Sequence, residues 1–446
     1  MSERAFTSIN RSVGWFVLSY AVAVVGYLGV NAAASRMVGR HSFGLFMVVV
    51  TSTALVGQFG LLGVHRSGLR EAARINDLGG AELAPLRADV RAVCKIPLPA
   101  ASLVTALVVM ALAHSENLGP RLVLALCTGA LVYLNGLQKL TSCFLRGLGH
   151  VRVAGLLEGR SGGALVALGQ VVTVVAVWRL VPGAGLAGGV AAATIGFAVP
   201  MVWAMRRLNR LWAGAALQDH TWTRLVVVAR RDWKFASIQI GGYVNATLDL
   251  WLCAILLSAV STSMFGASLR AAQLLLIPMT SLQVVFSPAV ARLSQDPDRR
   301  RLERLVRTGS TFATLIAAVF WLPMFFAPGL VLGTMFGHAY AEDGVALMLL
   351  ATGFFMNAAT GLSSTTLAMS QQEGWVSLVQ WIGVGLRIVC GTAAALLWGP
   401  IGLAASSMSV TILIYLLMWV QARRHIGVAT HLTLRPSARM LTRVAG

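Results

Sequence analysis

Charged side chains are scarce in this sequence. Only 12% of its residues are Asp, Glu, Lys or Arg and 57% are hydrophobic, whereas an ordinary soluble protein is about 25% charged. The mean hydropathy is +0.74. A water-soluble fold cannot bury so much apolar surface, but a lipid bilayer can accept it. The scarcity of charge therefore excludes an ordinary soluble enzyme and indicates a membrane protein.

Catalytic and metal-binding motifs are also lacking. The five cysteines form no Cys-x-x-Cys pair, so their spacing fits neither a zinc site nor a disulfide framework. The sequence has no phosphate-binding Gly-x-x-x-x-Gly-Lys and no His-Glu-x-x-His. We predict that the protein is not an enzyme and has no catalytic residues, no metal site and no cofactor. Transport would then be driven by proton or sodium coupling, by an electrical potential or by the gradient of the substrate.

Acidic residues are few, with 16 Asp and Glu against 36 Lys and Arg. The basic residues lie in short segments between apolar runs, as in membrane proteins, and are not clustered among polar segments as in nucleic-acid-binding proteins. We therefore expect the lipid bilayer, and no nucleic acid, as the partner of these charges.

Long apolar runs are what the sequence has in abundance. A bilayer core about 30 Å thick is spanned by about 20 apolar residues, and within it every backbone polar group must be satisfied, so the spans are helices. We predict an all-α polytopic membrane protein with about twelve transmembrane helices. The predicted spans are 13–34, 43–63, 96–114, 120–140, 153–177, 183–205, 235–260, 263–290, 308–331, 345–369, 374–398 and 401–421.

Lys and Arg predict the orientation of these spans. With the N-terminus inside, 29 basic residues fall in inner segments and four in outer loops, and basic loops stay on the cytoplasmic side. We therefore expect both termini in the cytoplasm. The basic content also predicts the domains, namely an N-terminal six-helix bundle (1–205), a basic cytoplasmic linker (206–233), a C-terminal six-helix bundle (234–421) and a basic cytoplasmic tail (422–446).

Apart from Arg121 and Lys139, which lie one residue from the ends of the span 120–140, five charged residues fall inside predicted spans: Asp249, Arg387, Arg270, Glu158 and Arg160. A charge at the bilayer centre costs at least about 2.5–3.5 kcal/mol, so it usually faces a bundle interior or a wet cavity. One interpretation is that the three arginines bind an anionic head group and that the two acids serve coupling or ion pairing. The alternative is a structural ion pair between Asp249 and one arginine, with Glu158 and Arg160 reaching the cytosolic face.

Several stretches resemble a known family. Ser35–Phe46 is similar to its Arg-x-Leu-Gly-x-x-x-Tyr-Gly turn, and Leu61–Gly63 to the start of its first inner loop. Phe265–Ala271, Ser287–Leu293 and Met335–Tyr340 resemble three further motifs, although Ser268 replaces the usual Tyr. In order and spacing these stretches resemble the multidrug/oligosaccharidyl-lipid/polysaccharide (MOP) exporter superfamily, and within it the polysaccharide-transporter or Wzx-type oligosaccharide flippase branch.

The resemblance implies two six-helix bundles in a V-shaped, MATE-like arrangement that opens alternately to each side. It also implies a polyprenyl-pyrophosphate-linked glycan as substrate, moved from the inner to the outer leaflet of the cytoplasmic (inner) membrane, with other membrane proteins of polysaccharide assembly as partners. From their charge we expect Arg160, Arg270 and Arg387 to meet the pyrophosphate.

Three alternatives stay open. A multidrug/cation antiporter of the same superfamily would favour an acidic cavity, whereas the predicted spans hold three arginines and two acids. A lipid II flippase usually has additional spans. A membrane polysaccharide polymerase or ligase would show a large outer loop bearing Arg or His, and the predicted outer loops are short.

Overall fold

The fold was analysed in a computed structural model, which describes residues 3–75, 83–113, 117–157, 163–212, 221–294, 299–342, 344–370 and 372–433. Within these ranges the chain is helical and contains no β-strand, which confirms the predicted all-α class. The helices are α1 (Glu3–Gly60), α2 (Val64–Ile75), α3 (Leu83–Lys95), α4 (Pro97–Leu112), α5 (Leu118–Gly147), α6 (Val151–Leu157), α7 (Gly163–Leu180), α8 (Gly185–Leu211), α9 (Thr221–Leu256), α10 (Ala259–Ala272), η2 (Gln273–Leu276), α11 (Ile277–Leu293), α12 (Arg299–Phe326), α13 (Pro328–Phe336), η3 (His338–Tyr340), α14 (Gly344–Thr360), α15 (Ser363–Met369), α16 (Glu373–Leu386), η4 (Arg387–Gly391) and α17 (Thr392–His425).

Among the described residues, eight helices are long and apolar enough to cross a membrane, or nine if the bent pair α14 and α15 forms one span. The protein is therefore a multi-pass membrane protein. Two of these helices each cover two predicted spans and contain a glycine with non-helical torsions, Gly39 (φ 73°) in α1 and Gly399 (φ 61°) in α17. The number twelve and the cytoplasmic location of the termini stay predictions.

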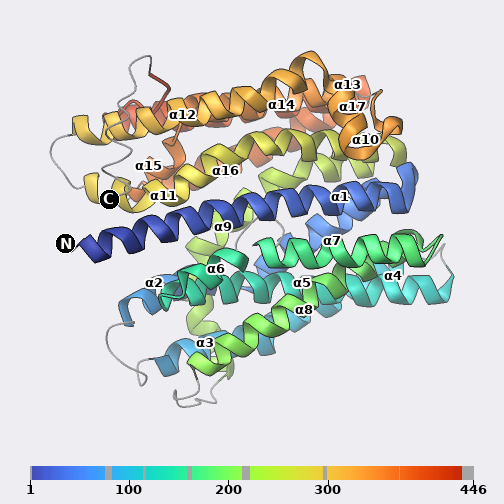
Figure 1. The fold of residues 1–446 in the computed structure, drawn as a ribbon, viewed down its shortest axis with the longest axis horizontal. Helices are drawn as coiled ribbons and strands as arrows, with labels where there is room; N and C mark the ends of the chain where they lie inside the picture. The colour runs from blue at the N-terminus through green and yellow to red at the C-terminus, as the bar shows by residue number, and fades with distance from the viewer. Residues whose placement is uncertain are drawn as a thin grey trace. The chain divides into compact units, whose positions relative to one another are not determined.

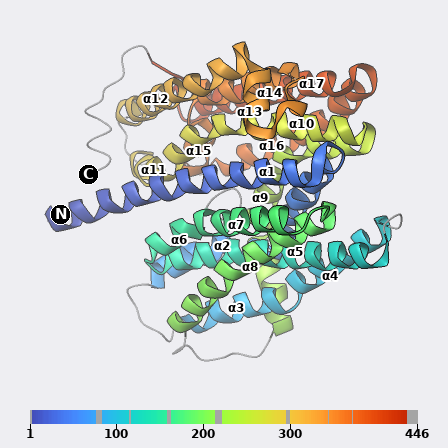
Figure 2. The ribbon, with the colours of Figure 1, turned by 45° about the vertical axis from the view of Figure 1, so that its right-hand side comes forward.

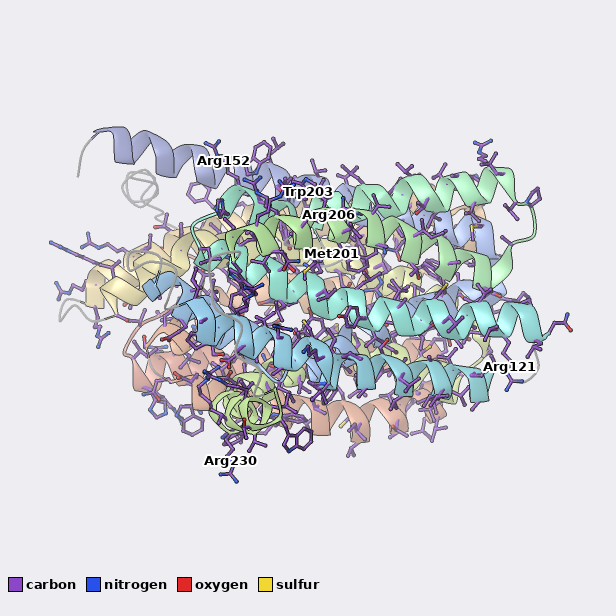
Figure 3. All side chains as sticks on the ribbon, turned by 90° about the horizontal axis from the view of Figure 1, so that it is seen from below. Arg121, Arg152, Met201, Trp203, Arg206 and Arg230 are labelled. Atoms are coloured by element: carbon purple, nitrogen blue, oxygen red, sulfur yellow. The ribbon has the colours of Figure 1, made fainter. Side chains whose placement is uncertain are left out.

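The chain forms two compact units, which we describe separately. The N-terminal unit is Trp15–Tyr243, and the C-terminal unit is Val244–Gly446 together with Met1–Gly14. The boundary lies within α9, beyond the end of the predicted linker at 233. Much of that linker is helical, because α8 continues to Leu211 and α9 begins at Thr221. In Figure 3 the first turns of α9, near Arg230, are seen end-on, so they run across the direction of α5 and α8.

In the N-terminal unit α5 is central and packs against α2, α4, α6 and α8, and α7 packs against α8. Figures 1 and 2 both show α5, α7 and α8 running side by side. Two polar side chains link α7 to α8: Gln170 Nε2 donates to the Ala193 carbonyl at 3.1 Å, and Thr173 Oγ1 donates to the Ala192 carbonyl at 2.7 Å. Hydrogen bonds of this kind and small residues are what bring membrane helices together, because lipid offers no hydrophobic driving force between them.

In the C-terminal unit α14 packs against α10, α12 and α17, and α17 also packs against α15 and α16. The predicted span 345–369 is broken, because α14 and α15 meet at a 48° bend. Gly361 stands at the break with φ +80°, and the segment after α17 returns to this point. There Thr430 Oγ1 donates to the Thr360 carbonyl at 2.8 Å. A backbone that leaves helical geometry inside a membrane protein is tolerated where the protein itself covers it.

Candidate functional site

Two of the predicted charges meet inside the C-terminal unit. Asp249 lies on α9 and Arg387 opens the π-helical turn η4, and the two residues are 138 positions apart in the chain. Arg387 Nη1 donates to Asp249 Oδ2, and the two side chains are 6% and 7% exposed. In a low-dielectric interior such a pair requires further hydrogen bonds to offset the desolvation of both charges.

Two hydroxyls of α17 supply these hydrogen bonds. Arg387 Nη1 donates to Ser407 Oγ at 2.9 Å, and Nη2 donates to Thr411 Oγ1 at 2.7 Å. Ser407 Oγ in turn donates to Asp249 Oδ2 at 2.7 Å. The four residues form a closed polar network, which we call the Asp249–Arg387 network. Ser407 and Thr411 were not among the predicted site residues, although their spacing of four places both hydroxyls on one face of a helix.

The π-helical turn helps to place Arg387 within this network. A π-turn inserts an extra residue into the helix and shifts the faces of the helix that follow, and such turns are frequent at functional sites. In η4 the guanidinium is buried, whereas Ile388 and Val389 are 48% and 69% exposed. The turn therefore separates a buried cation from apolar side chains that face outward.

The network leaves two buried polar atoms unsatisfied. Asp249 Oδ1 and Arg387 Nε have no hydrogen-bond partner among the described residues. Leaving such atoms unsatisfied in a buried network is costly, and each calls for an explanation, such as strain or a functional role. Within the network, Arg387 Nε is therefore a donor and Asp249 Oδ1 an acceptor that could still form a hydrogen bond.

The structure places the other predicted charges differently. Arg270, at the end of α10, is also buried, and its Nη1 donates to Gln273 Oε1 at 3.1 Å, at the start of η2. The predicted roles of Glu158 and Arg160 fall outside the described residues. The structure therefore brings Asp249 and Arg387 together, and the assignment of these charges to a substrate cavity stays a prediction.

A second charged cluster, which the sequence analysis missed, lies in the N-terminal unit. Arg231 donates to Asp232 through Nε and Nη2, both at 3.0 Å, and its Nη2 also reaches Asp89 Oδ2 at 3.1 Å. Ser67 Oγ donates to Asp232 Oδ2 at 2.6 Å, and Arg224 lies 3.6 Å from Asp89. The acids and the hydroxyl of this cluster come from three helices, α2, α3 and α9, which are far apart in the sequence. No local sequence pattern therefore predicts the cluster. It ties the start of α9 to the helices that precede the span α4.

Arginines lie toward both ends of the N-terminal unit. Figure 3 shows Arg121 at one end of the unit, and Arg152 and Arg230 toward the other. Among the described residues, no group of three or more His, Cys, Asp or Glu side chains is arranged to hold a metal ion.

The chain matches no protein-family model and no curated protein by sequence. Solved structures do match it. An inward-facing multidrug resistance MATE family transporter of the MOP superfamily has a TM-score of 0.62 at 13% identity, covering 92% of this chain and 94% of that chain. A mutant of the Vibrio cholerae MATE transporter VcmN has a TM-score of 0.61 at 12% identity, covering 95% of this chain and 99% of that chain.

A third match is a MOP superfamily transporter from Pyrococcus furiosus, described as having a binding pocket of reverse polarity that suggests a different function. Its TM-score is 0.57 at 14% identity, covering 94% of this chain and 96% of that chain. At these identities the likeness establishes the fold, and the chain therefore has a MATE-like fold. Its structural neighbours are transporters of the MOP superfamily, as the sequence resemblance implied, whereas the Wzx-type branch is not confirmed.

Proposed function

We propose that this protein is a membrane transporter that moves an anionic lipid-linked substrate, a polyprenyl-pyrophosphate-linked oligosaccharide, from the inner to the outer leaflet by alternating access. The observation that carries the proposal is the engagement of Asp249 by Arg387. In the C-terminal unit the described buried charged residues are Asp249, Arg270 and Arg387. A guanidinium is the side chain best suited to a phosphate, because its fork of donors binds two oxygens at once.

A cationic substrate fits this site less well. An organic cation would need a carboxylate whose charge is not already balanced, but the Asp249 carboxylate forms an ion pair with Arg387 through Oδ2, although its Oδ1 has no hydrogen bond. A phosphate oxygen, by contrast, would compete with Asp249 for the same guanidinium and would meet the hydroxyl of Thr411. A proton or sodium ion on Asp249 would weaken its hold on Arg387, which gives a physical basis for coupling ion binding to substrate binding.

A multidrug/cation antiporter is the second candidate, and the structural comparison favours it, because two of the three matches described above are MATE transporters, one of them a multidrug resistance protein. The Pyrococcus furiosus protein supports the view that pocket polarity, and with it function, varies on this fold. Fold likeness at 12–14% identity does not choose between the candidates, so the choice rests on the charge of the site.

The test uses a strain that lacks the gene, complemented with wild-type protein, Arg387→Gln, Arg387→Ala, Arg270→Ala, Asp249→Asn or the matched control Arg424→Gln. Arg424 is exposed at the end of α17. Surface polysaccharide, inner-leaflet lipid-linked precursor and sensitivity to a cationic dye are measured together, with the amount of inserted protein determined for each variant.

The flippase proposal expects the deletion strain to lose surface glycan and accumulate precursor. Arg387→Gln, Arg387→Ala and Arg270→Ala should fail to restore export when export is divided by the amount of inserted protein, whereas Arg424→Gln should restore it. An antiporter would give the opposite pattern. The deletion strain would keep its surface glycan and become more sensitive to the dye. Asp249→Asn would be inactive, whereas Arg387→Gln would keep dye efflux because the Asp249 carboxylate is released from its ion pair. Normal export by both Arg387→Ala and Arg270→Ala would refute the proposed role of the buried cations.

A further inference from the structure

The last turns of α8 carry an exposed face that changes from apolar to basic. Val199, Val202 and Trp203 are 68%, 51% and 45% exposed, and Arg206 and Arg210 continue the same face. The spacing of three and four residues places these side chains on one side of a helix. Together with Arg207 they line a surface pocket of about 440 Å³, which we call the α8 pocket.

The opposite face of α8 holds the helix in the N-terminal unit. Phe197, Met201, Ala204 and Leu208 are buried, and α8 packs against α5 and α7. The α8 pocket therefore lies on the outer surface of the unit. Figure 3 shows Trp203 and Arg206 on α8, well away from Arg121 at the far end of the unit.

Among the described residues, no anion is paired with the three arginines of the α8 pocket. None of them forms a hydrogen bond or ion pair with any residue that the structure describes, and the sequence of α8 contains no Asp or Glu. Three cations within five residues repel one another, and a shared anionic ligand would relieve this repulsion.

The position of the pocket along the helix identifies the ligand chemistry. At a rise of 1.5 Å per residue, Val199 and Arg210 are about 16 Å apart, which spans the step from acyl chains to phosphates. Exposed valines suit acyl chains, a tryptophan suits the membrane interface, and basic pockets beside it suit anionic head groups. A soluble phosphate compound has no acyl chain that would contact the exposed valines.

We propose that the α8 pocket binds an anionic glycerophospholipid from the leaflet predicted to be cytoplasmic. Arg206 and Arg210 hold the phosphate, Arg207 adds charge, and the acyl chains lie along Val199 and Val202 beside Trp203. This site is separate from the Asp249–Arg387 network and does not depend on the identity of the transported substrate.

The test places the full-length protein in phosphatidylcholine nanodiscs that contain increasing fractions of phosphatidylglycerol with brominated chains. Bromine quenches nearby tryptophans, and the signal of Trp203 is the difference between wild-type protein and Trp203→Phe. The same titration with brominated phosphatidylcholine measures contact with zwitterionic lipid. A triple variant, Arg206→Gln with Arg207→Gln and Arg210→Gln, tests the pocket.

A second triple variant, Arg299→Gln with Arg300→Gln and Arg301→Gln, is the matched control. It removes the same charge from an exposed basic turn at the start of α12, where no exposed large apolar side chain of the described residues adjoins the arginines in the sequence. Both triple variants are compared by thermal unfolding. The midpoint of the α8 triple variant should not change, because its arginines are exposed and form no hydrogen bond or ion pair with the described residues.

We expect brominated phosphatidylglycerol to quench Trp203 half-maximally at a lipid fraction at least fivefold lower than brominated phosphatidylcholine. The reason is that each basic residue near an anionic surface contributes about a fivefold preference. The α8 triple variant should abolish this difference, and the α12 triple variant should keep it. Equal quenching by the two lipids would refute the site. Equal loss in both triple variants would show general charge attraction instead, and displacement by millimolar inorganic phosphate would show a free-anion site.

Discussion

Removing only the Arg387 side chain should destabilise the C-terminal unit more than removing both charges of the Asp249–Arg387 network. Arg387→Met deletes three hydrogen bonds and leaves a carboxylate that is 7% exposed without its cation. Breaking a buried ion pair in this way costs about 3–5 kcal/mol, because the remaining charge is desolvated and uncompensated. For a folded unit of about 200 residues this is a fall in melting temperature of roughly 6–20 °C.

The double variant Asp249→Leu with Arg387→Met should recover most of this loss. Replacement of a buried pair by apolar residues of similar volume is often neutral or stabilising. The hydroxyls of Ser407 and Thr411 lose their partners, which costs about 1 kcal/mol each, but a helical hydroxyl can turn to a carbonyl of its own helix. We therefore expect a coupling energy of at least about 3 kcal/mol between the two positions.

The assay is thermal unfolding of the wild type, both single variants and the double variant in one detergent, with export measured for the same four proteins. If the network serves transport, the double variant is stable and inactive. If the network is only structural, the double variant is stable and exports normally. A melting temperature of Arg387→Met within about 2 °C of wild type, corresponding to about 1 kcal/mol or less, would refute the geometry on which this reasoning depends.

Three further predictions follow from the packing. Arg231→Ala should destabilise the N-terminal unit by about 2–3 kcal/mol, below the ~3–5 kcal/mol of a fully buried pair because the Arg231 side chain is 45% exposed, whereas the exposed neighbour Arg230→Ala should have little effect in the same melting assay. Gly361→Ala should cost more than about 2 kcal/mol, because its Cβ would collide with the Thr430 carbonyl in addition to the strain of positive φ; Gly399→Ala, with positive φ and open space, should cost only about 1–2 kcal/mol, and equal losses would contradict the steric explanation. Burial, and then the charges of two nearby arginines, lower the pKa of His431, so the unfolded chain takes up a proton first and stability should fall as the pH drops below about 6.5. Replacement of His431 by Phe should remove that part of the pH dependence of the melting temperature, and an unchanged profile would exclude His431 as its source.

Much of the architecture follows from the sequence alone. Runs of about 20 apolar residues must become helices in a membrane, because only helices satisfy their own backbone there. The sequence also identified Asp249 and Arg387 as charges that need an explanation, because a lone charge in lipid is costly. The predicted all-helical, MATE-like class is therefore confirmed, although breaks such as the one at Gly361 were not foreseen, since they depend on a returning segment far along the chain.

Only the tertiary structure decided how the charges pair. From the sequence, Asp249 could pair with any arginine in the predicted spans. Its pairing with Arg387, 138 residues away, depends on the rotation of α9 and on the π-helical turn at η4. The roles of Ser407 and Thr411 and the meeting of Arg231 with Asp89 depend in the same way on which helix faces touch. Apolar runs are local and can be read from the chain, whereas ion pairs between helices are set by packing angles and helix rotations to which residues far apart contribute.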